Sequence, residues 1–429
     1  MIFRLGLDDT DSPEGMCTTY LASVLSDKLR SEGITVKELL LVRLNPNVKF
    51  KTRGNAAVCL ICEGDLDCAF DTACIMVEKY ADFGCGNTNP GVVAVAEDAR
   101  PGAGFYLRAL RDFCTIDGTV GMLDKIPADK VRYRGWKNKR GLIGASASVA
   151  AELGDCSDKC ADDCTYELLV YRDPEDKGMR YVDRESLFEA EEKTYPHTWD
   201  SVDTVNNAVV CVPHTPDPVI YGIRGESPEW LQKADSYIIS QMPERSSLFR
   251  TNQGTDAHLT DADAGDIEDG KSYRISGKVF SSPESGPGGH VSFMLEGMDG
   301  SPVRCMAYEP TKNFRNIIRA LIPGDLVRVC GSFKGGSINL EKIEVTETAL
   351  LTEEKPPVCV CGKRMTSAGS GKGYKCRKCS EKSMVPEITV TERNLSPGWY
   401  EVPPVARRHL SKPLIRGKFQ VFKSNQIYR

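Results

Sequence analysis

Residues 2–12 read Ile-Phe-Arg-Leu-Gly-Leu-Asp-Asp-Thr-Asp-Ser, an apolar run that leads directly into three carboxylates, Asp8, Asp9 and Asp11. The run predicts a short β-strand, and a predicted helix follows that carries Thr18 and Thr19 in its first turns. Carboxylates crowded at the end of a strand repel one another unless a cation lies between them. Such hard oxygen ligands suit Mg²⁺, which is usually shared with substrate phosphates. The stretch therefore indicates phosphoryl or nucleotidyl chemistry, and the alternative is a polar turn that caps the helix.

Strands and helices alternate outward from this stretch, which favours an α/β layer architecture for residues 1–190. The predicted strands cover 2–7, 38–44, 56–61, 91–96 and 166–171, and the predicted helices cover 21–30, 67–80, 105–113 and 147–151. Residues 191–265 are predicted to form a second, α+β unit, with strands at 208–212, 219–223 and 247–250 and a helix at 228–241.

The C-terminal half changes character. Residues 271–346 contain five predicted short strands with one helix between the third and the fourth, an order typical of an OB-fold barrel. Residues 352–385 contain two close cysteine pairs, and this spacing predicts a zinc ribbon in which Zn²⁺ is bound by Cys359, Cys361, Cys376 and Cys379. Residues 386–429 form a basic arm, with seven Lys or Arg and no Asp or Glu from residue 402 onwards. Such an arm suits a nucleic-acid contact, and a solvated tail is the alternative.

The composition excludes several classes of protein. The 429 residues are 41% apolar and 27% charged, as in soluble globular proteins, and the net charge of −5 excludes binding of nucleic acid through overall basicity. No apolar run is long enough to cross a membrane and no secretory signal is present, so we expect a cytoplasmic protein. Most of the 17 cysteines are then expected to be thiols or metal ligands, and Cys156, Cys160 and Cys164 either line one helix face as metal ligands or lie in a variable loop.

A basic cluster over residues 132–141 holds five Lys or Arg in ten residues, followed by small residues and a possible helix start. Cations and backbone N–H groups arranged in this way can surround a polyphosphate, and a solvated loop is the alternative. The candidate phosphate ligands of this cluster are Lys137, Lys139, Arg140, Gly141 and Gly144. Lys51 and Arg53 are further candidates, in a segment that an ordinary polar turn also explains.

The barrel region offers rings that could stack on bases and cations that could contact phosphates. The candidates are Phe280, Phe293, Tyr308, Phe314, Lys312 and Arg315, and the arm adds Arg407 and Arg408. Because interior and exterior positions alternate along barrel strands, we expect about half of the rings to fill the core.

Together these segments resemble the archaeal tRNA(Ile) 2-agmatinylcytidine synthetase family along nearly the whole chain. The resemblance is carried, in the family's order, by residues 8–12, the helix with Thr18, and residues 51–55, 140–145, 196–198, 249–256, 308–312 and 403–410. It implies a kinase-like domain (1–190), a ferredoxin-like domain (191–265), an OB-fold (271–346) and a zinc ribbon (352–385), followed by the basic arm.

The resemblance also implies a reaction. ATP phosphorylates the C2 carbonyl oxygen of the wobble cytidine in the CAU anticodon of one isoleucine tRNA, and the primary amine of agmatine then displaces phosphate at C2. ATP ends as AMP and two phosphates, and the product pairs with adenosine, so AUA is decoded as isoleucine. Asp8, Asp9 and Asp11 would handle Mg²⁺ and the triphosphate, and the enzyme would phosphorylate itself on Thr18. A carboxylate must bind the guanidinium of agmatine, and Asp256 is the candidate.

Two other interpretations remain open from the sequence. A single-strand-binding protein built from an OB-fold and a zinc ribbon explains residues 271–429 but gives no task to the acidic turn. A protein kinase with Thr18 as one target leaves the C-terminal half unexplained. ATP turnover that requires both tRNA and agmatine distinguishes the synthetase from both.

Overall fold

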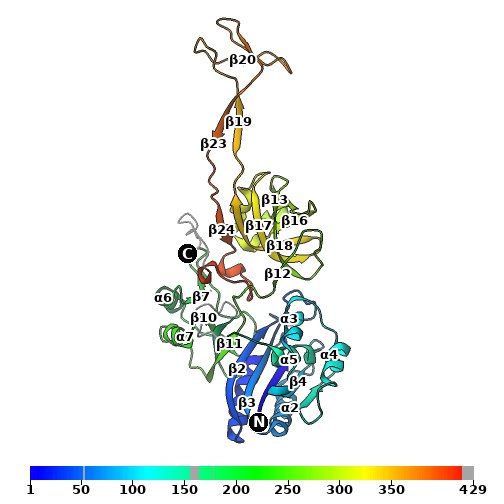
Figure 1. Cartoon of the computed structure of the whole chain (residues 1–429). Coiled ribbons are helices and arrows are strands. Elements are labelled where there is room, and N and C mark those ends of the chain that lie inside the picture. Colours follow the sequence, from blue (N-terminus) through cyan, green and yellow to red (C-terminus); the bar gives the residue numbers. More distant parts are fainter. Residues whose placement is uncertain (52–53, 155–163, 177, 418–429) are drawn as a thin grey trace.

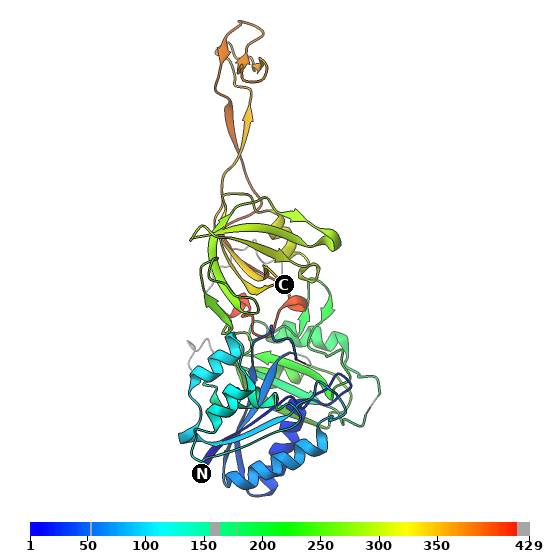
Figure 2. The ribbon, with the colours of Figure 1, turned by 90° about the vertical axis from the view of Figure 1, so that its right-hand side faces the viewer.

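The protein has an α/β body, a small β-barrel beside it, and a long two-stranded stalk that projects from the barrel (Figures 1 and 2). The structure is a computed structural model that describes residues 1–51, 54–154, 164–176 and 178–417. The candidate Arg53 and the cysteines Cys156 and Cys160 lie outside the described residues. Cys164 is disulfide-bonded, whereas the other described cysteines are free thiols.

One mixed sheet of nine strands forms the centre of the body, in the order β5-β4-β1-β3-β2-β11-β6-β10-β7. Its strands are β1 (Ile2–Asp8), β2 (Thr35–Arg43), β3 (Ala56–Glu63), β4 (Gly91–Ala96), β5 (Val131–Gly135), β6 (Thr165–Tyr171), β7 (Thr198–Trp199), β10 (Val219–Gly225) and β11 (Arg245–Thr251). The parallel pair β2–β11, with Arg250 opposite Leu40, joins the strands from both predicted N-terminal units into this single sheet. Two short strands, β8 (Val202–Asp203) and β9 (Ala208–Val209), pair separately.

Helices cover both faces of the sheet. They are α1 (Thr18–Ser31), α2 (Leu66–Tyr80), α3 (Ala103–Arg111), α4 (Ile116–Leu123), α5 (Gly141–Ala150), α6 (Arg184–Thr194) and α7 (Pro228–Asp235). Phe3, Leu5 and Leu7 point from β1 into a core shared with α1 and α2, because alternate side chains of a strand face opposite sides. Gly6 faces α5 instead, where an added Cβ would lie 2.4 Å from the carbonyl oxygen of Ala145. The α5 backbone therefore packs directly on β1.

Each predicted strand and helix of the body has a counterpart, although β9 is shorter than the predicted strand at 208–212, and β5, α4 and α6 were not predicted. The largest differences in length concern two helices. Helix α5 begins at Gly141, six residues before the predicted start, because close packing outweighs the low helix propensity of glycine. Helix α7 ends at Asp235 rather than at residue 241. The backbone of Ile239 instead bonds to the start of α6: its carbonyl accepts from Asp183 N (2.7 Å) and its N–H donates to Ser186 Oγ (2.9 Å).

The barrel has the predicted order of five strands with one helix after the third. Its strands are β13 (Ser272–Val279), β15 (Val291–Gly297), β16 (Pro302–Ala307), β17 (Leu326–Lys334) and β18 (Ser337–Glu347), and the helix is α8 (Phe314–Arg319). The ring closes because β13 pairs with both β15 and β17, while β18 pairs with both β16 and β17. Three outer strands, β12 (Leu259–Asp261), β14 (Glu284–Ser285) and β24 (Gly398–Glu401), add to this sheet.

The stalk consists of β19 (Leu351–Lys355) and β23 (Glu387–Thr391), paired antiparallel, and it carries three short strands at its tip (Figure 1). These strands are β20 (Thr366–Ser367), β21 (Tyr374–Lys375) and β22 (Lys382–Ser383). The four predicted zinc ligands lie at this tip, so the chain's structural metal site is held away from the α/β body.

Residues 402–417, here called the C-terminal segment, lie between the barrel and the body (Figure 2). The backbone N–H groups of Gly254, Thr255 and Asp256 donate to the carbonyls of His409 and Leu410 at 2.7–3.2 Å. Buried ion pairs reinforce this contact: Arg407 pairs with Asp200 and with Glu401 (2.8 Å). Residues 402–417 of the predicted basic arm are therefore a structural connection between the two halves, whereas its earlier residues belong to β23 of the stalk and β24 of the barrel.

Glu191 of α6 lies beneath this junction and provides a pH-dependent stability term. Burial, with the nearby negative charge of Asp200, raises the pKa of Glu191 to about 8 from 4.5. As the pH rises from about 4.5 to about 8, the unfolded chain has lost this proton while the folded chain still holds it, so folding becomes less favourable. Between pH 5 and pH 8.5, the unfolding free energy of the wild type should therefore decrease. In Glu191→Gln this decrease should be smaller by about 3–5 kcal/mol.

Urea unfolding at the two pH values measures this difference. Glu189→Gln, at an exposed carboxylate of the same helix, is the matched control and should keep the wild-type pH dependence. Equal pH dependence in Glu191→Gln and wild type would contradict the assignment.

Candidate active site

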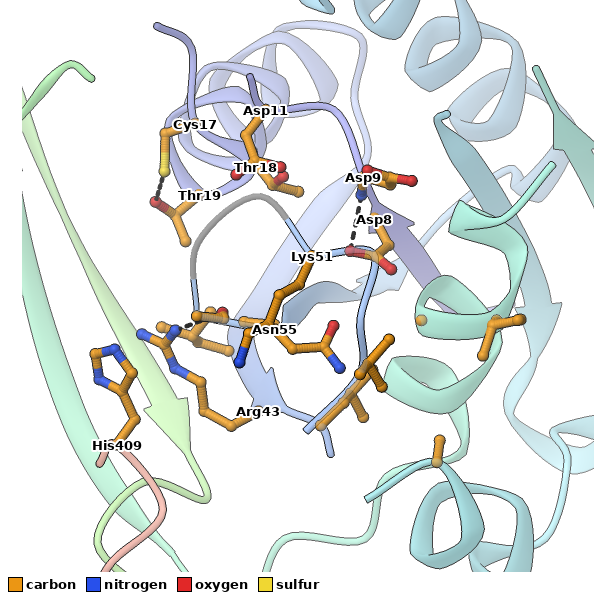
Figure 3. Close-up of a pocket in the computed structure, with 18 of the residues that line it drawn as sticks. Asp8, Asp9, Asp11, Cys17, Thr18, Thr19, Arg43, Lys51, Asn55 and His409 are labelled. Carbon is orange, nitrogen blue, oxygen red and sulfur yellow. Dashed lines mark hydrogen bonds between the residues drawn. The ribbon is translucent and has the colours of Figure 1, made fainter. Parts of the chain in front are cut away.

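A cavity of about 780 Å³ lies in the body at the C-terminal end of β1. Its wall is formed by the acidic turn, the start of α1, the loop after β2, the start of α5, strands β6 and β10, and His409 of the C-terminal segment. Figure 3 shows Asp8 and Asp9 on one side of this cavity and Arg43 and His409 on the other. One cavity therefore has an acidic side and a basic side.

The acidic turn places two buried carboxylates next to each other. Asp8 is the last residue of β1, and its Oδ1 accepts a hydrogen bond from the Asp9 N–H (2.7 Å), with Asp9 at a positive φ of 59°. Burial raises the pKa of Asp8 well above its ordinary value, and the negative charge of Asp9 adds to this effect. Burial also raises the pKa of Asp9 to about 7, although the ion pair with Arg140 (2.8 Å) opposes it. Such carboxylates are destabilised as anions until a cation or a donor joins them.

Helix α5 begins directly against this turn. An added Cβ on Gly144 would lie 1.9 Å from Asp8 Oδ2, and one on Gly141 would lie 2.4 Å from the backbone N of Gly91. Only glycine permits these approaches. The first backbone N–H groups of α5 already have partners: Gly141 donates to the carbonyl of Asn89 (2.9 Å), Leu142 to that of Lys139 (3.1 Å) and Ile143 to that of Arg140 (3.0 Å). The close approach therefore brings the positive end of the helix dipole beside the carboxylates, and this end favours phosphate oxygens.

Two threonine hydroxyls line the cavity beside the turn. Thr18, the first residue of α1, accepts a hydrogen bond from Thr10 Oγ1 (3.0 Å), and both side chains are buried. Thr19 Oγ1 lies 3.0 Å from Cys17 Sγ. The Thr18 hydroxyl is therefore held on the side of the acidic turn.

The predicted phosphate ligands divide into two groups. Lys51, Arg140 and Gly144 line the cavity, and Gly141 lies immediately behind it at the start of α5. Lys137 and Lys139 do not line it: both are exposed, and Lys137 Nζ donates to the carbonyl of Cys85 (2.6 Å). Their assignment to phosphate contacts is not supported by this geometry.

Sequence reasoning missed the basic side of the cavity. It is formed by Arg43 of β2, Arg224 of β10 and His409, which surround the buried carboxylate Glu167 of β6. Residues 403–410 were part of the family resemblance, but no local pattern connects residues 43, 224 and 409. Only the folded sheet brings them together.

The agmatine candidate Asp256 is not in the cavity. Its carboxylate accepts from Lys342 Nζ at 2.8 and 3.0 Å and from the backbone N–H of Lys412 at 2.7 Å. Because a buried ammonium group already neutralises it, Asp256 is a structural residue of the junction, and the assignment to agmatine is withdrawn.

The nucleic-acid candidates also divide by exposure. Phe280 is 62% exposed, and Tyr308 and the side chain of Lys312 are also exposed on the barrel surface. Arg315 is not available in the same way, because its side chain is 16% exposed and donates to the carbonyls of Gly289 (2.6 Å) and Lys312 (3.1 Å). Phe293 and Phe314 are buried in the barrel core, so neither ring is available to a base, which corrects the assignment of Phe293. Arg407 is likewise excluded, since its side chain is 6% exposed and paired. Arg408 is partly exposed and donates to Ser332 Oγ (2.6 Å).

The four ribbon cysteines fit a zinc ion. All four sulfur atoms lie within 4.8 Å of one another, as the edges of about 3.8 Å in a Zn²⁺–thiolate tetrahedron require. Within the ranges that the structure describes, no other set of three or more potential ligands converges in this way. The acidic turn is thus not a closed metal site, although Mg²⁺ commonly takes only one or two carboxylates together with substrate phosphates.

Comparison with known proteins gives a consistent result along the chain. Residues 4–135 match the TiaS TCKD domain, residues 139–258 the TiaS FLD domain, and residues 356–395 the TiaS C-terminal zinc ribbon domain. The tRNA(Ile2) 2-agmatinylcytidine synthetase TiaS of Methanocorpusculum labreanum is 49% identical over 417 residues, which cover 96% of this chain and 97% of that protein. The same enzyme of Archaeoglobus fulgidus is 45% identical over 421 residues, with 96% and 97% covered.

Solved structures agree with these relatives. The TiaS–tRNA(Ile2)–ATP complex superposes with a TM-score of 0.89 at 42% identity, and the TiaS–tRNA(Ile2)–AMPCPP–agmatine complex with a TM-score of 0.87 at 40% identity. Each comparison covers all of both chains. No helix among the described residues is long and apolar enough to cross a membrane.

Proposed function

The chain belongs to the TiaS family of tRNA(Ile2) 2-agmatinylcytidine synthetases, and from this premise we propose which groups of its cavity perform the ligation. The enzyme uses ATP to join agmatine to a cytidine of tRNA(Ile2). A binding protein without catalysis is not favoured, because that interpretation leaves the cavity unused. A tRNA-modifying activity also carries the expectation of a cytoplasmic location.

We assign the modified cytidine to the wobble position of the CAU anticodon, and the reacting atom to C2 of its cytosine base. The cytosine O2 is a poor leaving group, and transfer of a phosphoryl group from ATP makes it a good one. The primary amine of agmatine then forms the bond to C2, and O2 leaves with the phosphate. The base must leave its stack to enter the cavity, as in other enzymes that act on bases.

The observation that carries this assignment is the contact of the α5 start with Asp8. Phosphoryl transfer depends on positioning and charge neutralisation, and this contact places the positive end of the α5 dipole, two carboxylates and Arg140 around one point. Asp8 and Asp9, with Asp11 beside them, would hold Mg²⁺ there, which when bound neutralises the phosphate oxygens. Arg140 and the start of α5, from Gly141 to Gly144, orient the triphosphate, with Lys51 nearby.

The remaining parts fit the same proposal. Residues 1–190 form the kinase-like unit, 191–265 the ferredoxin-like unit, 271–346 an OB-fold and 352–385 the ribbon, followed by residues 386–429. We assign tRNA contacts to Phe280, Tyr308, Lys312 and Arg408 on the surface. The decisive experiment incubates tRNA(Ile2) with the protein, ATP, Mg²⁺ and agmatine, and measures nucleoside masses. One cytidine should gain an agmatine less one water, and an unchanged mass would refute the function.

Thr18 is proposed as the site of self-phosphorylation. Its hydroxyl lies beside the acidic turn, whereas the Thr19 hydroxyl contacts Cys17. After incubation with ATP and Mg²⁺, peptide mass analysis should find one phosphate that Thr18→Ala removes and Thr19→Ala retains. A phosphate that persists in Thr18→Ala would contradict the assignment.

Loss of zinc should affect tRNA binding rather than chemistry at the cavity. Because a site of four thiolates holds so small a ribbon together, Cys376→Ser should unfold the tip and make it sensitive to proteases. We expect the Kd for tRNA to rise by about tenfold, equivalent to 1.4 kcal/mol, while the KM for ATP stays constant. Filter binding and limited proteolysis measure this, with Cys68→Ser, at an exposed free cysteine of α2, as the control. A ribbon that remains protease-resistant would contradict the zinc assignment.

A further inference from the structure

The basic side of the cavity is assembled from three distant parts of the chain. Arg224 Nη2 donates to Nδ1 of His409 at 2.7 Å, and Arg43 Nη1 donates to the carbonyl of Gly54 at 2.9 Å. An added Cβ on Gly54 would lie 2.9 Å from both Arg43 Nη1 and His409 Cδ2. The backbone at Gly54 therefore packs tightly against Arg43 and His409, which lie on the same side of the cavity in Figure 3.

This side of the cavity has an excess of positive charge. Glu167 lies 3.3 Å from Arg224 and 3.8 Å from Arg43, so one carboxylate serves two guanidinium groups. Lys51 adds a further cation to the lining. Asp217 also lines the cavity, but its carboxylate pairs with Arg180 (3.7 Å) and accepts from the Val219 N–H (2.9 Å). A partly buried positive surplus of this kind is relieved by an anion.

His409 supplies a neutral donor to the same place. A guanidinium group can only donate, so Nδ1 of His409 accepts and the ring proton resides on Nε2. Burial, with the positive charges of Arg43 and Arg224, holds the pKa of His409 well below its ordinary value, so the ring stays neutral. The Nε2–H group makes no hydrogen bond to any residue that the structure describes.

We propose that Arg43, Arg224 and His409 form a binding subsite for a phosphate ester, and that the ester is the phosphodiester of the tRNA nucleotide that enters the cavity. The proposal rests on the proposed function. Guanidinium groups can donate paired hydrogen bonds to the oxygens of a phosphodiester, and this binding needs no metal ion. The groups proposed above for the triphosphate of ATP include Asp8 and Asp9, which lie on the other side of the cavity (Figure 3). A base that leaves its stack brings its backbone phosphate with it, so both anions occupy one cavity during the reaction.

Two substitutions at His409 separate its roles. Asn keeps an acceptor near the position of Nδ1 for Arg224 but has no donor near Nε2, whereas Gln can place an amide N–H there. We expect His409→Asn to raise the Kd for tRNA(Ile2) by about tenfold, and His409→Gln to stay within about twofold of wild type. Arg224→Gln should raise the Kd similarly and lower the slope of log Kd against log salt by about one. The KM for ATP should change by less than about twofold in all three.

The control is Lys130→Gln, which removes a cation at the opposite end of the sheet, where Lys130 pairs with Asp98 (2.6 Å). Filter binding over a range of KCl concentrations, with melting temperatures to confirm folding, gives the readout. A raised KM for ATP with unchanged tRNA affinity would assign the subsite to the triphosphate and overturn the proposal. Wild-type Kd values in a folded His409→Asn protein would also overturn it. If wild-type protein modifies tRNA in the nucleoside assay, such a result rejects only the subsite and leaves the function intact.

Discussion

Asp9→Asn should reduce the incorporation of agmatine into tRNA(Ile2) by about 10³-fold or more, while the Kd for tRNA changes by less than about twofold. The substitution keeps the size of the side chain but removes the charge that faces Arg140 and the proposed cation. Without that charge, the triphosphate lacks the groups that fix its position and balance its own charge. The proposed tRNA contacts lie on the barrel, the ribbon and the basic side of the cavity, so affinity should persist.

Two measurements test this division of tasks: nucleoside mass analysis for turnover and filter binding for affinity. Asp98→Asn, at an exposed carboxylate that pairs with Lys130, is the matched control and should retain wild-type turnover. Loss of tRNA affinity in a folded Asp9→Asn protein would show that the acidic turn takes part in RNA binding, against the assignment. Turnover within about tenfold of wild type would remove Asp9 from the phosphoryl-transfer site.

Arg407→Ala should lower the free energy of unfolding by about 3–5 kcal/mol. The side chains of Arg407 and Asp200 are 6% and 4% exposed, and Arg407 also pairs with Glu401 at 2.8 Å. Removal of the guanidinium group would leave two buried carboxylates without their cation, close to the buried Glu191. Uncompensated buried charge is among the most destabilising changes that one substitution can make.

Urea unfolding at pH 7 measures the effect. Arg364→Ala removes another arginine from a short ion pair, with Glu387 at 2.6 Å, but both side chains are exposed on the ribbon. Exposed pairs contribute about 0–1 kcal/mol, so this control should be close to neutral. A loss below about 1 kcal/mol in Arg407→Ala would mean that the C-terminal segment is not held by charge.

Local patterns predicted most of the secondary structure, the βββαββ order of the barrel and the zinc ligands. They succeed because alternation, helical spacing and cysteine pairs are properties of neighbouring residues. The sequence also contained the signal that Phe293 fills the barrel core and does not contact RNA. Val291, Phe293 and Leu295 occupy alternate positions of one strand, and all three are buried in the barrel. The rings of Phe280 and Tyr308 fall outside the buried set.

Long-range pairing explains what the sequence could not predict. Arg407 lies in a segment without acidic residues, which suggests a free cation, but its partner Asp200 is 207 residues away. His409 and Arg224 are 185 residues apart, and nothing in either neighbourhood indicates that they meet. The pairing of Asp256 was unpredictable for the same reason, because its partner Lys342 lies on β18, 86 residues further along the chain. Charges near one another in space are not near one another in the chain.

The place of His409 in the cavity has a consequence for synthesis of the protein. A ribosome makes the acidic turn at its first steps, and among the described residues that line the cavity His409 is the last to be made. Because chains begin to fold from the N-terminus during translation, the body can start to form while the cavity still lacks one wall. A nascent chain that has not reached this histidine is therefore unable to assemble the complete reaction chamber, however well its earlier parts have folded.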